Sequence, residues 1–293
     1  MKSNKFSNKA IGPWLELMKF RLSFSVALSA FAGYFMFRQG FEQAAWFLLL
    51  GVMLLASGVA VINQCQEHKT DRLMNRTKNR PIPCGSINAK LALAYGLGLI
   101  IIGALVLFLK NGFLVAILGL FNAFWYNLIY TPLKRKTAFA VVPGGVCGAI
   151  PPLMGWVAAG GYIWHPKILL LAFFFFVWQI PHFWLILLKY GKEYAAAGMP
   201  SITNLLNRDQ LRGITFIWLL ASGVSALFLP VFSMLTNQAF KVIIVILVAI
   251  YFVLGFWALY KSKSFVNYKL AFITVNLFLI FVIFTLIADK VFV

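Results

Sequence analysis

The chain has 293 residues, of which 62% are hydrophobic and only 11% charged, and its formal net charge is +19. A soluble globular protein carries about 25% charged residues, so the composition excludes that class. The positive charge does not indicate nucleic-acid binding, because uncharged apolar runs of about 20 residues, each long enough to cross a bilayer, recur along the chain. The sequence therefore predicts an integral membrane protein that lies in the lipid bilayer and does not bind nucleic acid.

Nine apolar runs, bounded by charged residues, Gly or Pro, follow one another in chain order. None alternates polar and apolar residues as a membrane barrel does, so each is expected to be a helix, which satisfies its own backbone in lipid. We predict an all-α membrane protein, a single domain over residues 1–293 with nine transmembrane helices. The expected spans are 20–37, 45–66, 91–109, 112–130, 138–159, 168–188, 213–234, 241–260 and 270–288.

The basic residues are distributed unevenly over the connections between these spans. The odd-numbered connections and the C-terminal tail hold only Arg38, Lys110, Lys167, Lys241 and Lys290, and all other Lys and Arg residues lie at the N-terminus or on the even-numbered connections. Cytoplasmic connections carry the excess of Lys and Arg in membrane proteins. We therefore expect the N-terminus in the cytoplasm and the C-terminus outside.

Two of the seven acidic residues lie at the cytoplasmic end of the second span, in the segment VINQCQEHKTDRLMNRTKNRP. Asn63, Glu67 and Asp71 are spaced by four, so on a continuing helix they lie along one face and turn by about 40° per step. Two carboxylates and an amide oxygen suit a hard cation such as Mg²⁺, which often shares its shell with substrate phosphates. We predict a metal site here that holds a diphosphate.

Three arginines follow this acidic set, again spaced by four: Arg72, Arg76 and Arg80. Guanidinium groups match the geometry of phosphate oxygens, and positive charge stabilises a departing diphosphate. The spacing therefore favours diphosphate binding next to the metal. The alternative is that these arginines only enforce the topology of the membrane helices.

The segment from Asn63 to Pro81 resembles the first aspartate-rich motif of the UbiA superfamily of intramembrane prenyltransferases. Four further segments resemble the haem branch of that superfamily, the protohaem IX farnesyltransferases: YTPLKRKT from residue 130, GAIPPLMGW from 148, WQIPHFW from 178 and KEYAAAGMP from 192. Two positions depart from the superfamily pattern. Glu67 stands where Asp is usual, and a second acidic motif is reduced to Glu193, as in the haem branch.

The resemblance implies a UbiA-type helical bundle that transfers the farnesyl group of farnesyl diphosphate to a vinyl group of haem b, giving haem O. It implies Mg²⁺ as cofactor, a bacterial plasma (inner) membrane location, and the haem A synthase or oxidase assembly as candidate protein partners. The implied catalytic residues are Asn63, Glu67, Asp71, Arg72 and Arg76. The implied substrate-binding residues are Arg80, Tyr126, Asn127, Tyr130, Lys134, Arg135, Trp178, Gln179, His182, Lys192 and Glu193.

Other interpretations stay open at this point. Tyr126 and Tyr130 also suit an aromatic belt at the membrane surface. His182 either contacts the haem, because imidazole is a usual ligand of haem iron, or satisfies backbone that Pro181 leaves unpaired. For the whole chain, the alternatives are an aromatic prenyltransferase of quinone biosynthesis and a transporter. Acidic residues at helix ends, away from the membrane midplane, disfavour transport.

Overall fold

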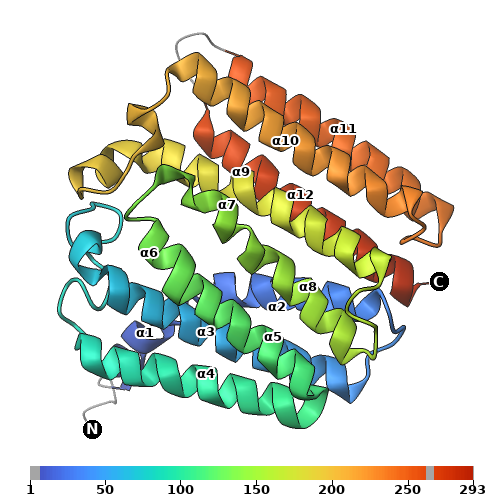
Figure 1. The fold of residues 1–293 in the computed structure, drawn as a ribbon, viewed down its shortest axis with the longest axis horizontal. Coiled ribbons are helices and arrows are strands. Elements are labelled where there is room, and N and C mark those ends of the chain that lie inside the picture. The colour runs from blue at the N-terminus through green and yellow to red at the C-terminus, as the bar shows by residue number, and fades with distance from the viewer. Residues whose placement is uncertain (1–6, 262–266, 293) are drawn as a thin grey trace, which may run out of the picture.

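The computed structural model describes residues 7–261 and 267–292, and the regular structure in these residues is helical throughout (Figure 1). The predicted all-α fold is confirmed. Lys2, Lys5 and Lys263, which entered the orientation argument, lie outside the described residues. The long and short helices are α1 (Ser7–Leu17), α2 (Phe20–Phe35), α3 (Gln43–Asp71), α4 (Ala89–Asn111), α5 (Phe113–Phe124), α6 (Thr131–Leu133), α7 (Val141–Gly144), α8 (Val146–Ala158), α9 (Pro166–Ala196), α10 (Arg208–Val231), α11 (Gln238–Tyr260) and α12 (Tyr268–Val291). A π-helical segment η1 (Trp125–Tyr130) and two 3₁₀ segments, η2 (Ala138–Ala140) and η3 (Ile202–Asn204), complete the described elements.

The number of spans differs from the prediction at the first of them. Within the described residues, eight helices are long and apolar enough to cross a membrane, where nine spans were expected. The expected span that is not among these eight is the first, which corresponds to α2 and has 16 residues. At 1.5 Å per residue it is about 24 Å long, less than the roughly 30 Å of a bilayer core. The difference therefore concerns one short apolar helix.

Two long helices continue beyond their expected spans at the same end of the molecule. The second span was expected to end at residue 66, but α3 continues to Asp71, and α9 continues to Ala196 where the sixth span was expected to end at 188. These additional turns carry Glu67, Asp71 and Glu193 on rigid helices. The acidic residues are therefore held in fixed positions relative to the bundle.

The backbone is irregular where the fourth and fifth spans approach this end. α5 passes into η1, and the next span starts with η2 and the short helix α7 before α8 begins. Single π-helical turns are frequent at functional sites, and irregular backbone at membrane depth is tolerated where it lines a cavity. Both segments contribute to the cavity described below.

Small residues allow the central helices to pack closely. A Cβ atom at Gly33 of α2 would overlap the backbone of Pro152, and one at Gly155 of α8 would overlap the backbone of Ala30. Glycine at such positions lets membrane helices approach through their backbones. One apolar core joins α2, α3, α5 and α8, and a second joins α9 to α12. In Figure 1, α4 and α11 lie along opposite edges of the bundle.

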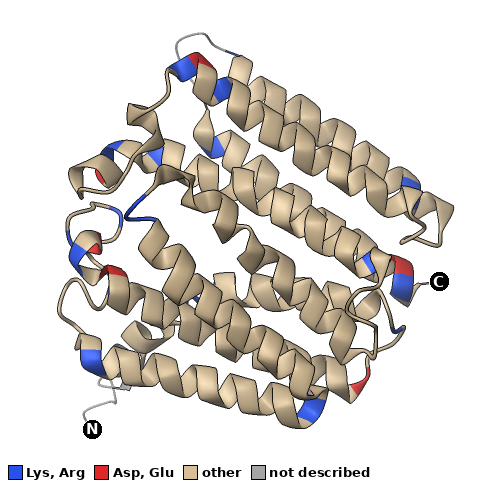
Figure 2. Cartoon of the chain, in the orientation of Figure 1, with Lys and Arg blue, Asp and Glu red and all other residues tan. Residues whose placement is uncertain are grey.

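Charged residues gather at one end of the bundle. Figure 2 shows most Lys and Arg residues on its left, where the loop 72–88, the turn 131–137 and the segment 197–207 lie together. Fewer charged residues mark the opposite end, where α12 finishes with Asp289 and Lys290. The chemistry expected of the acidic and basic motifs is thus concentrated at one end.

Candidate active site

A cavity of about 320 Å³ lies at the charged end, between α3, η1, α7 and α9. Among the side chains that line it are four basic ones and two carboxylates, and this excess of basic groups suits a polyanion. Nine predicted site residues line it: Asn63, Glu67, Asp71, Arg76, Arg80, Tyr126, Tyr130, Lys134 and His182. The structure thus brings together residues that are up to 119 positions apart in the sequence.

The two carboxylates of α3 are buried, and each is paired with a basic residue from another segment. Glu67 is 9% exposed and its Oε1 lies 2.6 Å from Lys134 Nζ. Asp71 is 1% exposed and its Oδ2 lies 2.7 Å from Arg80 Nη1. A buried carboxylate needs such a partner, because its desolvation is otherwise too costly. Each ion pair joins the basic group to one carboxylate oxygen, and both carboxylates line the cavity, where they can meet a ligand.

Asn63 supplies the third oxygen of the predicted metal set. Its amide nitrogen donates to Thr131 Oγ1 at 3.1 Å, which orients the amide and leaves its carbonyl oxygen for a ligand. Within residues 7–261 and 267–292, no three His, Cys, Asp or Glu side chains group closely enough to hold a metal alone. A cation here would therefore use Asn63, Glu67 and Asp71 together with oxygens of its substrate. Such a hard-oxygen set fits Mg²⁺.

The π-helical segment η1 forms an aromatic wall of the cavity. The Tyr126 and Tyr130 ring centroids lie 5.2 Å apart, and Tyr130 stacks on Phe183 of α9 at 5.3 Å with an interplanar angle of 11°. Lys134 Nζ lies 5.1 Å from the Tyr130 centroid. Gly144 leaves room for this stack, since a Cβ there would lie 2.7 Å from a Tyr130 ring atom. Aromatic faces of this kind stabilise a nearby cation.

His182 lines the same cavity from α9. Its ring lies among the aromatic rings of Trp178, Phe183 and Phe272, with centroids 5.1 to 5.5 Å away, and Asn276 is a polar neighbour. Nδ1 is buried and makes no complete hydrogen bond within the described residues. The backbone bond that was one interpretation of this histidine is therefore not made by Nδ1. A buried polar atom in this state points to a ligand or an ordered water.

Seven predicted site residues do not line the cavity: Arg72, Asn127, Arg135, Trp178, Gln179, Lys192 and Glu193. At the charged end of the bundle, Arg72 Nε donates to the Pro83 carbonyl at 3.2 Å, Arg135 donates to the Gln66 carbonyl, and Lys192 is exposed. Each of these three basic residues is one or two positions from a residue that lines the cavity, so its side chain points in a different direction from that of its neighbour.

The other four are occupied in packing between helices or loops. Trp178 Nε1 donates to the Val275 carbonyl at 2.8 Å, which ties α9 to α12. Gln179 lies against Gly148 of α8, and Asn127 is buried with its backbone carbonyl accepting from Gln66. Their motif segments thus hold the helices that carry the cavity residues. Glu193 accepts a hydrogen bond from the backbone N–H of Arg76 at 3.1 Å.

The structure also places residues in the cavity that the sequence did not indicate, among them Lys19, Phe183, Tyr194 and Met199. Lys19 comes before the first span and was counted only for topology, and no pattern marks it. Burial, together with the nearby Arg80, lowers the pKa of Lys19 to about 7. Phe183 and Tyr194 each follow a predicted residue by one position in the motif segments, which was a usable signal.

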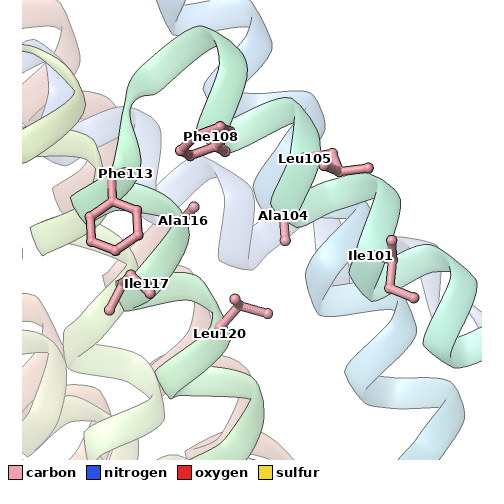
Figure 3. A pocket seen from close by; sticks show the side chains of 8 residues that line it. All are labelled: Ile101, Ala104, Leu105, Phe108, Phe113, Ala116, Ile117 and Leu120. Carbon is pink, nitrogen blue, oxygen red and sulfur yellow. The ribbon is translucent and has the colours of Figure 1, made fainter.

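A second hollow, of about 310 Å³, lies between α4 and α5 (Figure 3). Its lining is wholly apolar and consists of Ile101, Ala104, Leu105, Phe108, Phe113, Ala116, Ile117 and Leu120. Several of these side chains are about half exposed on the surface of the bundle. Because it offers no polar group, this hollow cannot perform the predicted chemistry, which leaves the charged cavity as the candidate active site.

The model of the UbiA prenyltransferase family matches residues 26–287 of the chain. The chain belongs to this family. It is therefore an integral membrane prenyltransferase, and its long apolar helices agree with that. Among curated relatives, the protohaem IX farnesyltransferase of Geobacter sulfurreducens is 39% identical over 224 residues, which cover 76% of this chain and 83% of the relative.

Solved structures of UbiA homologues share the fold. The apo homologue from Aeropyrum pernix K1 is 18% identical, with a TM-score of 0.69 over 89% of this chain and 98% of that chain. The homologue from Archaeoglobus fulgidus bound to DMAPP and Mg²⁺ is 16% identical, with a TM-score of 0.65 over 94% and 99%. At these identities the likeness establishes the arrangement of helices, and the chemistry must be argued from the residues of this chain.

Proposed function

We propose that this chain is a Mg²⁺-dependent protohaem IX farnesyltransferase, which converts haem b and farnesyl diphosphate to haem O and diphosphate. The observation that carries the proposal is that buried oxygen ligands, basic side chains, an aromatic wall and a histidine whose Nδ1 has no hydrogen-bond partner among the described residues meet in one cavity. The relative from Geobacter sulfurreducens supports haem b as acceptor by its name. The homologue bound to DMAPP and Mg²⁺ supports a prenyl diphosphate and that metal.

The diphosphate would bind at the end of the cavity where α3 finishes. Asn63, Glu67 and Asp71 would hold the metal, which when bound neutralises charge on the leaving diphosphate. Arg80 and Lys134 already lie beside these carboxylates, with pair distances of 2.7 and 2.6 Å. The side chains of Arg80 and Lys134 would each donate some of their hydrogen bonds to phosphate oxygens, because charge-assisted hydrogen bonds to phosphate are strong.

The farnesyl group would react against the aromatic wall. When the bond between its C1 atom and the diphosphate oxygen breaks, the electron pair leaves with the diphosphate and an allylic cation remains. Tyr130 and Phe183, stacked at 5.3 Å, present ring faces that stabilise this cation and keep bulk water away. The electron pair of the acceptor's vinyl double bond then forms the new carbon–carbon bond with C1, which leaves a cation on the vinyl carbon next to the porphyrin ring. A single water molecule adds to that carbon and releases one proton to the medium, which gives the hydroxyl group of haem O.

His182 is the residue we assign to the acceptor. It lines the cavity about one and a half helical turns before Leu187, another lining residue of α9, and its ring is surrounded by aromatic side chains. Imidazole is a common ligand of haem iron, and planar aromatic neighbours suit a planar macrocycle. We therefore propose that His182 contacts the haem.

The charge distribution supports a proposal for the orientation of the chain in the membrane. The end that carries the cavity also carries most Lys and Arg residues, which supports a cytoplasmic position by the positive-inside rule (Figure 2). We propose a cytoplasmic N-terminus, an outside C-terminus and the bacterial plasma membrane as the location. The haem A synthase or the oxidase assembly are the proposed recipients of the product.

The test is to incubate membranes that contain the chain with haem b, farnesyl diphosphate and Mg²⁺, and to analyse extracted haems by mass spectrometry. Haem O is expected, and its formation should stop when a chelator removes Mg²⁺. Membranes with the Asp71→Ala variant serve as the control. Absence of haem O, combined with prenylation of a hydroxybenzoate or a naphthoate in a parallel assay, would assign the chain to quinone biosynthesis instead.

A further inference from the structure

Glu193 is the one acidic residue among the predicted site residues that the function above does not use. It lies near the C-terminal end of α9, where the partial charge of the helix end is also negative, so it needs a donor nearby. The structure provides one: Glu193 Oε2 accepts the backbone N–H of Arg76 at 3.1 Å, across 117 positions of sequence. Glu193 does not line the cavity. Its carboxylate is directed to the loop 72–88 that follows α3.

The side chain of Arg76 is held by the same helix. Its guanidinium carbon lies 4.8 Å from the ring centroid of Tyr190, which precedes Glu193 by three positions and so shares its face of α9. Arg76 is therefore attached to α9 at two points, the backbone through Glu193 and the guanidinium through Tyr190. Arg76 is exposed and lies in a turn, where its side chain would otherwise populate many rotamers. Even so, it lines the cavity.

An apolar contact reinforces this attachment. Met74 of the loop 72–88 is 4% exposed and packs in one cluster with Ala197 and Met199 of the segment after α9, and Tyr194 packs against it. Met74, Tyr194 and Met199 all line the cavity. The loop 72–88 and the end of α9 thus meet directly beside the diphosphate end of the cavity.

We propose that Glu193 is a positioning residue that fixes Arg76 over the cavity for binding of the prenyl diphosphate, and that it is not a metal ligand. The cation site then belongs to α3 alone, and the second acidic position of the chain serves to close the two cytoplasmic segments on each other. This inference rests on the proposed function, because it takes a prenyl diphosphate to be the ligand that Arg76 meets.

Binding of farnesyl diphosphate to purified protein in Mg²⁺, measured without haem, tests the inference apart from the haem reaction. Glu193→Ala should weaken binding about tenfold, the effect of losing about 1.4 kcal/mol of hydrogen bonding to a charged group. Glu193→Gln should stay within about threefold of the wild type, because its amide oxygen still accepts the Arg76 N–H. The Mg²⁺ concentration for half-maximal binding should be unchanged in both variants.

The turnover assay gives a second readout, in which Glu193→Ala raises the KM for farnesyl diphosphate more than it lowers kcat. Asp209→Ala is the matched control, since Asp209 is an exposed acid at the start of α10. Equal damage in Glu193→Gln and Glu193→Ala, with a higher Mg²⁺ requirement, would make Glu193 a metal ligand and overturn the inference. Wild-type binding by both variants would also overturn it. Normal binding of farnesyl diphosphate without formation of haem O would instead refute the proposed function and leave the inference standing.

Discussion

Two buried acidic sites lie at opposite ends of the bundle, and their surroundings differ. Asp289 at the end of α12 is fully buried, and it accepts bonds from the Thr236 N–H, the Thr236 hydroxyl and the Asn237 N–H at 2.9 to 3.0 Å. Lys290 Nζ lies 2.9 Å away. Each of its oxygens has partners, so Asp289 acts as a structural cap for the loop before α11.

The carboxylates of Glu67 and Asp71 have fewer partners and face a cavity. Each pairs with one basic side chain through one oxygen, and both line the space where further basic residues gather. Saturated hydrogen bonding to backbone N–H groups at a buried carboxylate indicates a structural role, whereas a buried carboxylate that lines a cavity beside basic side chains indicates a ligand. The two ends of the molecule thus show that burial of an acid alone does not identify an active site.

The largest expected effect is the loss of prenyl transfer when the acid at the charged end is changed, since the acid at the other end should not affect activity. Asp71→Asn keeps the size of the side chain and removes the charge that would hold the cation. We expect prenyl transfer to fall at least about a hundredfold, the scale of losing one preorganised electrostatic contact in a transition state. The melting temperature in detergent should fall less than in the Asp289→Ala variant below, because the asparagine amide oxygen still accepts a hydrogen bond from Arg80. Product formation by mass spectrometry and a thermal melt check both expectations, and full activity would place the cation elsewhere.

The complementary variant at the other end should affect stability. Asp289→Ala leaves the backbone N–H groups of Thr236 and Asn237 and the Lys290 ammonium without their acceptor. Removing one partner from a buried charge pair costs about 3 kcal/mol. We expect a clearly lower melting temperature but a normal KM for farnesyl diphosphate at temperatures where the protein remains folded. A changed KM with an unchanged melt would reverse the roles of the two sites.

A variant of intermediate effect tests the acceptor side of the cavity. His182→Ala should weaken haem binding about tenfold, equivalent to about 1.4 kcal/mol, and leave the binding of farnesyl diphosphate unchanged. His165→Ala is the matched control, because that histidine caps the other end of α9, where its Nδ1 accepts the Lys167 N–H at 3.2 Å. Spectroscopic haem titration compares the two variants. Identical titrations would return His182 to a packing role.

The smallest expected effect concerns pH at the diphosphate end. Burial, with the nearby positive charges of Arg80 and Lys134, lowers the pKa of Lys19 to about 7, although Glu67 and Asp71 partly oppose this shift. Below pH 7 the amine is protonated and attracts the diphosphate, and above pH 7 that charge is lost. We therefore expect the KM for farnesyl diphosphate to rise about threefold between pH 6 and pH 8, which corresponds to a loss of about 0.7 kcal/mol of binding free energy. Lys19→Met should remove this pH dependence, and a profile that is unchanged in the variant would contradict the assignment.

Much of the fold could be read from the chain because its signals are local. Apolar runs predicted the helices, but the second span was expected to end at residue 66, whereas α3 continues to Asp71 and carries Asn63, Glu67 and Asp71 on one helix. The first span was overestimated because composition alone does not show that α2 ends after 16 residues. The turn into η1 was not predicted, since a π-helical segment has no distinct sequence pattern.

The sequence by itself determined that this is a helical membrane protein and which motifs carry acids and bases, because hydropathy and helical spacing depend on neighbouring residues. Only the tertiary structure decided which of them meet. The pairs Glu67 with Lys134 and Arg76 with Glu193, and the presence of Lys19 in the cavity, depend on contacts between helices and connecting segments that are distant in the chain. Such contacts are set by packing of whole helices, so no local pattern encodes them.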